Sequence, residues 1–122
     1  LRHAQLLTAA VEAAATLDVE QIVWPVQVGE QFDELARITE TIELVQQLAA
    51  ANGIDTPPIE TPLLEMTDRQ VIEVGHQMDV PWTLGRSCPQ PGRGPCGRCE
   101  ACHRRAAGFE AAAVEDPLLT SV

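Results

Sequence analysis

All four cysteines of the 122-residue chain lie within fifteen consecutive residues, at the spacing C-x7-C-x2-C-x2-C. They are Cys88, Cys96, Cys99 and Cys102. Gaps of two residues let neighbouring thiolates point at one centre, and the loop of prolines and glycines after the first cysteine can bring that cysteine round to them. Four sulfurs in such an arrangement suit a tetrahedral zinc ion, with Zn–S distances of about 2.3 Å.

Two other uses of these cysteines stay open. Two disulfides would be strained by the two-residue spacers, and no feature of the sequence marks a secreted protein. An iron–sulfur cluster is the other alternative, because C-x2-C-x2-C also occurs in ferredoxin-like sites. The absence of a fifth cysteine favours zinc, as does Gly97, which suits a tight knuckle. Four protein sulfurs leave no position for water or substrate, so we expect a structural zinc, with His103 as the alternative ligand.

The composition narrows the class of partner. Eighteen acidic residues against eight basic ones give a net charge of −10, which argues against a duplex nucleic-acid binder. No apolar run approaches the roughly 20 residues that span a bilayer, and no signal peptide is visible. Clustered, metal-spaced cysteines fit a reducing compartment, so we expect a cytoplasmic protein without membrane contacts.

Five of the eight arginines form the one basic group of this acidic chain. They are Arg86, Arg93, Arg98, Arg104 and Arg105. The group is a weak hint of a phosphate or RNA contact, and loop solvation is the simpler interpretation. For Arg105 we expect a carboxylate or a helix end as its partner.

The first half of the chain alternates between helical and extended patterns. The periodicity predicts a helix over residues 2–17, with Leu6, Ala10, Ala13 and Leu17 on its apolar face. The apolar run 22–24 predicts a strand buried on both faces, and a second helix is expected over 32–51. A second strand is expected over 59–64.

The second half predicts two helices around the cysteine loop. Thr67 and Gln70 form a capping box, and the helix that follows is expected to bury Val71, Ile72, Gly75 and Met78. The last helix is predicted from about residue 99 to 114, with two of the cysteines in its first turn, where the helix dipole favours thiolate.

This order predicts an α/β fold with a parallel sheet. Two parallel strands do not form a stable sheet alone, so we expect part of a doubly wound sheet, followed by a helical four-cysteine zinc knuckle. The expected domains are 1–84, the C-terminal half of a Rossmann-like domain, and 85–122, the zinc-binding subdomain. The chain begins at Leu1 rather than Met, which raises the expectation of an upstream segment.

A set of short motifs resembles the 7-cyano-7-deazaguanine synthase family, the zinc-containing, ATP-dependent enzymes of queuosine-precursor biosynthesis. The matching segments are Thr61-Pro62-Leu63-Leu64, Val80-Pro81-Trp82, Ser87-Cys88, Cys96-Gly97-x-Cys99-x-x-Cys102-x-x-Arg105-x-x-x-Phe109 and Asp116-Pro117. The resemblance implies a PP-loop ATPase fold (adenine nucleotide alpha hydrolase-like), the four cysteines as zinc ligands, and a homodimer. It implies a ligase that uses ATP, Mg²⁺ and ammonia to convert 7-carboxy-7-deazaguanine to an amide and then the nitrile.

The sequence departs from the family pattern in two places. The phosphate-binding loop Ser-Gly-Gly-x-Asp-Ser is absent from this chain, so we expect the chain alone neither to bind nor to hydrolyse ATP. Residues 24–30 and the pair Arg2-His3 differ from the segments that help form the nucleobase site in the family. A PP-loop paralogue with another carboxylate or nucleobase substrate, and a zinc-stabilised partner-binding module, are the alternative functions.

Overall fold

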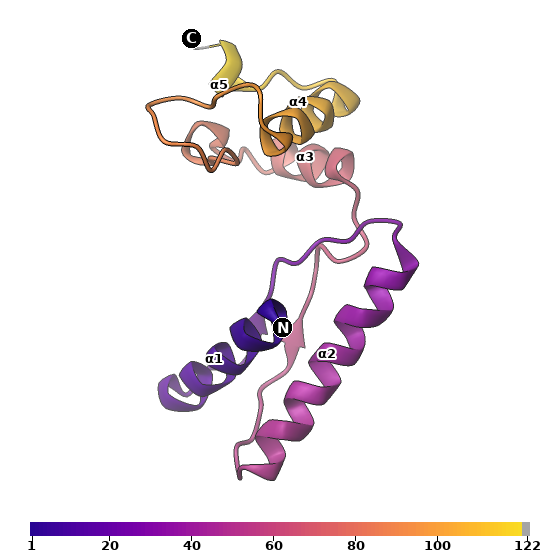
Figure 1. The fold of residues 1–122 in the computed structure, drawn as a ribbon, viewed down its shortest axis with the longest axis vertical. Helices are drawn as coiled ribbons and strands as arrows, with labels where there is room; N and C mark the ends of the chain where they lie inside the picture. Colours follow the sequence, from indigo (N-terminus) through magenta and orange to yellow (C-terminus); the bar gives the residue numbers. More distant parts are fainter. Residues whose placement is uncertain (121–122) are drawn as a thin grey trace. The chain divides into compact units, whose positions relative to one another are not determined.

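The computed structural model describes residues 1–120 and divides the chain into two compact units (Figure 1). Unit 1 is Leu1–Glu65, and unit 2 is Met66–Val122. The helix before the cysteine loop therefore belongs to the same unit as that loop. The expected domain division after residue 84 stays a prediction, because a unit defined by packing is not the same as a domain that folds alone.

Unit 1 is an α/β arrangement built on a two-stranded parallel sheet (Figure 1). Its elements in chain order are α1 (Arg2–Leu17), β1 (Ile22–Val23), α2 (Phe32–Ala51) and β2 (Ile59–Glu60). Strands β1 and β2 pair with Ile22 opposite Ile59. The alternation of helix and parallel strand is thus confirmed, as are the bounds of the second helix.

The core of unit 1 lies where α1 and α2 pack together and against the sheet. Six buried residues form it: Leu7, Val11, Trp24, Ile38, Val45 and Ala49. The paired residues Ile22 and Ile59 are half-buried and pack against this cluster. Side chains alternate across a strand, so Val23 and Glu60 turn to the other face of the sheet and are exposed.

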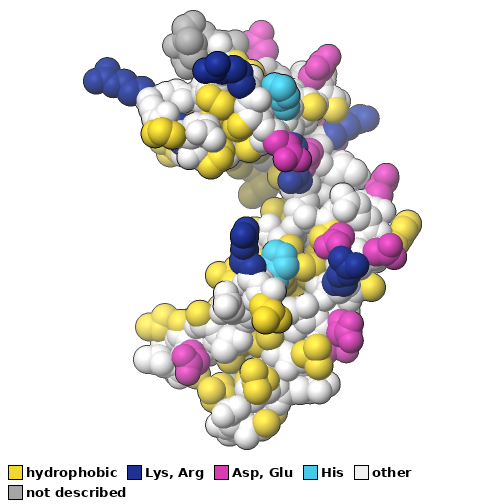
Figure 2. All heavy atoms as spheres, viewed as in Figure 1, with side chains coloured by type: hydrophobic (Ala, Val, Ile, Leu, Met, Phe, Trp, Pro, Cys, Tyr) yellow, Lys and Arg dark blue, Asp and Glu magenta, His cyan; other side chains and the backbone are white. Residues whose placement is uncertain are grey.

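Three expectations for unit 1 are wrong in detail. Helix α1 buries Leu7, Val11 and Ala14, one residue along from the predicted face, because its bulkier side chains meet α2 and β1 there. The first strand is not buried on both faces, since Val23 is 54% exposed. The second strand stops at Glu60, because a turn occupies residues 62–65. Hydrophobic side chains are also exposed on the surface of unit 1 (Figure 2), Phe32 and Leu44 among them.

Unit 2 consists of α3 (Asp68–Gln77), the short 3₁₀ helix η1 (Trp82–Leu84), α4 (Glu100–Ala112) and α5 (Pro117–Thr120). The predicted capping box is confirmed. The backbone N–H of Gln70 donates to Thr67 Oγ1 (3.3 Å), and the backbone N–H of Thr67 donates to the side-chain Oε1 of Gln70 (2.9 Å). The predicted start of the last helix is confirmed as well, with Cys99 as the N-cap of α4.

Helix α3 packs closely against α4 and against η1 because a glycine lies at each contact. A Cβ on Gly108 would lie 2.9 Å from Ile72 Cδ1. A Cβ on Gly75 would lie 2.7 Å from Trp82 Cη2 and closer still to Cζ2. The Trp82 ring in turn contacts Phe109 edge-on, with ring centroids 5.3 Å apart. Ile72 and Gly75 are therefore buried as predicted, whereas the next position of that stripe, Met78, is 72% exposed at the end of α3.

No helix in the part of the chain that the structure describes is both long enough and apolar enough to cross a bilayer.

We predict that Gly75→Ala destabilises unit 2, because the added methyl group meets the rigid Trp82 ring, which Phe109 holds from the other side. Overpacking of this kind costs about 1–3 kcal/mol, more than the roughly 1 kcal/mol that alanine gains over glycine in a helix. Urea denaturation followed by far-UV circular dichroism measures the change. Gln77→Ala, on the exposed end of the same helix, is the control. A Gly75→Ala protein as stable as this control would contradict the close contact.

Candidate metal centre and its supporting contacts

The structure brings the four cysteine sulfurs together, with all four within 4.8 Å of one another. The Sγ atoms of Cys96 and Cys102 are 3.9 Å apart, and those of Cys88 and Cys99 are 4.0 Å apart. A tetrahedron with Zn–S distances of about 2.3 Å has S–S edges of about 3.8 Å. The cluster therefore has the dimensions of a four-thiolate metal site. All four cysteines are free thiols, and the two measured separations are near twice the S–S bond of a disulfide, about 2.05 Å.

Backbone amides position these sulfurs. Cys96 begins a tight knuckle in which Gly97 has a φ of 71°, and Cys96 Sγ accepts hydrogen bonds from the amides of Arg98 (3.4 Å) and Cys99 (3.3 Å). Cys99 Sγ, at the N-cap of α4, accepts from the amide of Cys102 (3.4 Å). Three sulfurs are thus placed by one knuckle and one helix start, as the short spacing indicates.

The first cysteine reaches the centre from the far end of the loop. Cys88 is buried, and its Sγ accepts from the Cys96 amide at 3.4 Å. This bond joins the two ends of the loop directly at the sulfur. His103 follows the last ligand position but is exposed on α4. Among the residues that the structure describes, the four cysteines are the one group of clustered His, Cys, Asp or Glu side chains that could hold a metal ion.

The amide hydrogen bonds prepare part of the cluster for the thiolate state. Those from Arg98 and Cys99 lower the pKa of Cys96 to about 6, and the amide of Cys96 lowers the pKa of Cys88. For Cys102 the Gly97 amide also favours thiolate, but burial and the three neighbouring sulfurs outweigh it and raise its pKa to about 11. Thiolates crowded together oppose further ionisation, and a cation at their centre would remove that opposition.

Arg86 is a residue whose role the sequence did not reveal. Its guanidinium donates hydrogen bonds to four backbone carbonyls of the loop, those of Cys88, Gln90, Gly92 and Gly94. The sequence pattern grouped Arg86 with other arginines as a basic patch, and nothing in that pattern distinguishes a loop-binding arginine from a solvated one.

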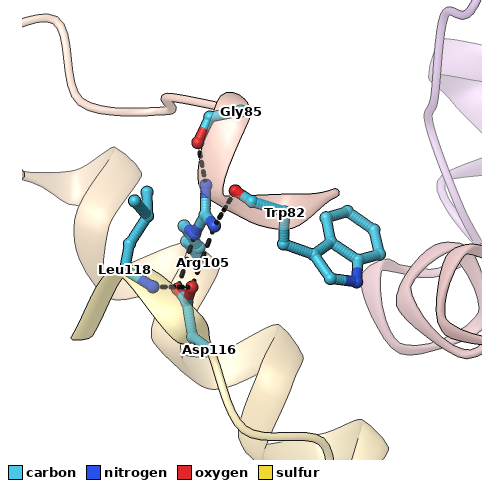
Figure 3. A network of polar contacts seen from close by, with 5 residues as sticks. All are labelled: Trp82, Gly85, Arg105, Asp116 and Leu118. Carbon is cyan, nitrogen blue, oxygen red and sulfur yellow. Dashed lines mark hydrogen bonds and ion pairs between the residues drawn. The ribbon is translucent and has the colours of Figure 1, made fainter. Parts of the chain in front are cut away.

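Arg105 ties the end of the chain to the segment that precedes the loop (Figure 3). It forms a two-pronged ion pair with Asp116, with Nε to Oδ2 at 2.6 Å and Nη2 to Oδ1 at 2.9 Å. The same guanidinium donates to the carbonyls of Gly85 (2.6 Å) and Trp82 (3.1 Å). The prediction that Arg105 pairs with a carboxylate is confirmed.

Arg104, one residue earlier, makes a pair of the same geometry on the surface. Its Nε and Nη2 each lie 2.8 Å from an oxygen of Asp68, which joins α4 to α3. Three of the five clustered arginines are therefore engaged within the protein, while Arg93 and Arg98 are exposed. The group does not form one phosphate-binding patch.

The Asp116 carboxylate is held ionised in a buried place. Burial by itself raises its pKa, but the hydrogen bonds from Arg105 and from the Leu118 amide outweigh burial and lower it. A carboxyl whose pKa is lowered on folding stabilises the folded state above its ordinary pKa of about 3.9. That contribution is lost as the pH falls through the lowered value.

We predict that Asp116→Asn destabilises the protein at pH 7 by about 3 kcal/mol, because it leaves the Arg105 charge largely buried without its partner. The difference from wild type should begin to shrink below about pH 3.9, where Asp116 of the unfolded chain becomes neutral, and it should disappear below the lowered pKa of the folded protein, where folded Asp116 is neutral too. Urea midpoints at pH 7 and pH 3 measure both effects. Asp68→Asn is the matched control, since its side chain is 35% exposed against 2% for Asp116, and should cost about 1 kcal/mol or less. Equal losses in both variants would contradict the account.

A family model described as queuosine biosynthesis protein QueC matches residues 1–113. The 7-cyano-7-deazaguanine synthase of Methanothermobacter thermautotrophicus is 30% identical over 109 residues, which are 88% of this chain and 48% of that protein. The synthase of Anaeromyxobacter dehalogenans is 31% identical over 122 residues, covering 95% of this chain and 52% of that protein. The chain spans about half the length of these curated relatives. It belongs to the family of the queuosine biosynthesis protein QueC.

Proposed function

We propose that the protein containing this chain is an ATP-dependent ligase that converts 7-carboxy-7-deazaguanine and ammonia to 7-cyano-7-deazaguanine. The observation that carries the proposal is the family match over residues 1–113. Relatives matched along most of this chain bear the name of that synthase, and the chain spans about half their length. The ATP and Mg²⁺ sites, and the remaining strands of a doubly wound PP-loop sheet, belong in this proposal to sequence outside the present chain.

The chemistry explains why such an enzyme needs ATP. A carboxylate oxygen is a poor leaving group, and transfer of a phosphoryl or adenylyl group to it makes it displaceable by ammonia. The first product is an amide. Its oxygen must be activated in the same way, by a second ATP, so that it leaves with the phosphoryl or adenylyl group while the amide nitrogen loses its two protons, which gives the nitrile. In an open parallel sheet the ligands bind outside the carboxyl ends of the strands. We place these steps in the cytoplasm, where free thiols persist, and in a homodimer as the resemblance implies.

We further propose that the four cysteines hold one structural zinc ion. The sulfur separations of 3.9 and 4.0 Å support a closed tetrahedral site, and four thiolates leave no open position on the metal. When bound, zinc contributes cross-linking and charge neutralisation, not a reactive water. In small zinc modules such binding stabilises the fold by an amount on the order of 10 kcal/mol. The residues it would cross-link are the loop start, the knuckle and the first turn of α4.

One contact favours a second candidate, a related enzyme with a different carboxylate or nucleobase substrate. The ring of His3 lies 5.3 Å from that of Trp24. Both residues belong to segments in which the sequence departs from the family's pattern for the nucleobase site. Departures that contact each other are what a changed substrate would require, so substrate assays should include other deazapurine and purine carboxylates.

We predict that the purified protein contains one zinc ion per chain and that Cys99→Ser lowers its zinc content and its helicity. Cys99 is both a proposed ligand and the N-cap of α4, so its loss opens the tetrahedron where the helix begins. Elemental analysis and far-UV circular dichroism measure the two effects. His103→Ala is the matched control and should retain both. Native helicity with a full complement of zinc in Cys99→Ser would exclude this residue as a ligand.

We predict that the protein expressed from its complete coding sequence forms 7-cyano-7-deazaguanine from 7-carboxy-7-deazaguanine, ATP, Mg²⁺ and ammonium. With ¹⁵N-ammonium the label should enter the nitrile, as detected by mass spectrometry. Omission of ATP or of ammonium is the control and should abolish the product. Turnover of another carboxylate would support the related enzyme with a changed substrate. If no tested carboxylate gave an ATP-dependent product, the proposed ligase activity would be wrong, and the zinc-stabilised partner-binding module would be the remaining alternative.

A further inference from the structure

The loop from Cys88 to Cys96 cannot fold through its own backbone. Three of its positions are proline, which lacks an amide hydrogen: Pro89, Pro91 and Pro95. Within the part of the chain that the structure describes, no backbone-to-backbone hydrogen bond involves any residue from 86 to 98. Yet the loop must return Cys88 to within 4.0 Å of Cys99, at the start of α4. The Cys96 amide joins the two ends of the loop at Cys88 Sγ, so it is the path of the residues between them that a group other than the loop backbone has to fix.

The Arg86 guanidinium is that group. Nε donates to the Cys88 carbonyl (2.9 Å), and Nη1 donates to the Gly92 carbonyl (3.0 Å). Nη2 donates to the carbonyls of Gln90 and Gly94, the latter at 3.3 Å. Every second carbonyl from 88 to 94 thus points at one side chain. The planar fork of arginine presents its donors in fixed directions, so it sets the curvature of the whole turn.

We propose that Arg86 is the positioning residue of the metal centre, and that it controls how fast the metal is lost. Three sulfurs are held by one knuckle and one helix start, but Cys88 lies across a loop that would otherwise sample many conformations. By holding the loop closed, Arg86 keeps the Cys88 sulfur at the site after any transient break of its bond to the metal. Its positive charge also offsets the net negative charge of four thiolates on one divalent ion.

The shape of the side chain and its charge can be separated. Lysine keeps the charge, but its compact ammonium group cannot donate to four carbonyls spread around a turn. Arg93 offers a matched control within the same loop: it has the same charge and is exposed. If charge alone mattered, Arg86→Lys would behave as wild type, and Arg93→Ala would resemble Arg86→Ala.

The test measures zinc transfer from the full protein to excess 4-(2-pyridylazo)resorcinol, a coloured chelator. We expect Arg86→Ala to release zinc about tenfold faster than wild type, because the loss of a contact supporting a metal ligand typically lowers metal affinity by about tenfold or more and here that loss should appear in the release rate. Arg86→Lys should release it nearly as fast, and Arg93→Ala should remain at the wild-type rate. In cobalt-substituted samples all four proteins should start with the same tetrahedral four-thiolate spectrum, which shows that the ligands are retained.

Release from Arg86→Ala within twofold of Arg93→Ala, or a wild-type rate in Arg86→Lys, would overturn the proposal. If Arg86→Ala fails to fold, Arg86→Lys decides alone. The proposal rests on the metal centre proposed above and not on the ligase activity. A wild-type protein without bound metal would refute the metal centre, whereas a stable metal with unchanged release from the Arg86 variants would refute only the role of Arg86.

Discussion

The convergence of four sulfurs from a fifteen-residue segment is the constraint on which unit 2 depends. The segment carries three prolines, and a single knuckle separates its loop from α4. Such a segment has few backbone hydrogen bonds to fold it back on itself, and the negative charges of four crowded thiolates repel one another. Amide hydrogen bonds to sulfur offset part of that opposition and lower the pKa of Cys96 to about 6, whereas the raised pKa of Cys102 reflects the part that remains. A divalent cation would offset the rest.

The contacts around the centre extend this constraint through unit 2. Arg86 holds the loop, the Arg105–Asp116 pair holds the segment before it, and glycines let α3 and α4 approach. Unit 1 is organised differently, by apolar contacts between two helices and a two-stranded parallel sheet. The proposed roles follow this division. Unit 1 would contribute two strands to the parallel sheet of a PP-loop ATPase fold, and unit 2 would be held together by the proposed zinc ion and by ion pairs.

The features that the sequence predicts correctly are those determined by residues close together in the chain. The bounds of α2, the capping box of α3 and the helix start at Cys99 follow from periodicity, side-chain caps and ligand spacing. The misjudged features depend on how segments pack against one another, which no local pattern fixes. The buried face of α1 is chosen by α2 and β1, and nothing near Arg86 in sequence shows that four carbonyls surround it. Burial at a helix end such as Met78 likewise depends on where the next segment goes.

Zinc K-edge X-ray absorption of the purified protein would identify the atoms bound to the metal. We expect a first shell of four sulfurs at about 2.3 Å, with no nitrogen or oxygen ligand. A shell of three sulfurs and one imidazole would show that a histidine replaces a cysteine. Absence of a zinc edge, or an iron edge in its place, would contradict the closed zinc centre from which the organisation of unit 2 is argued.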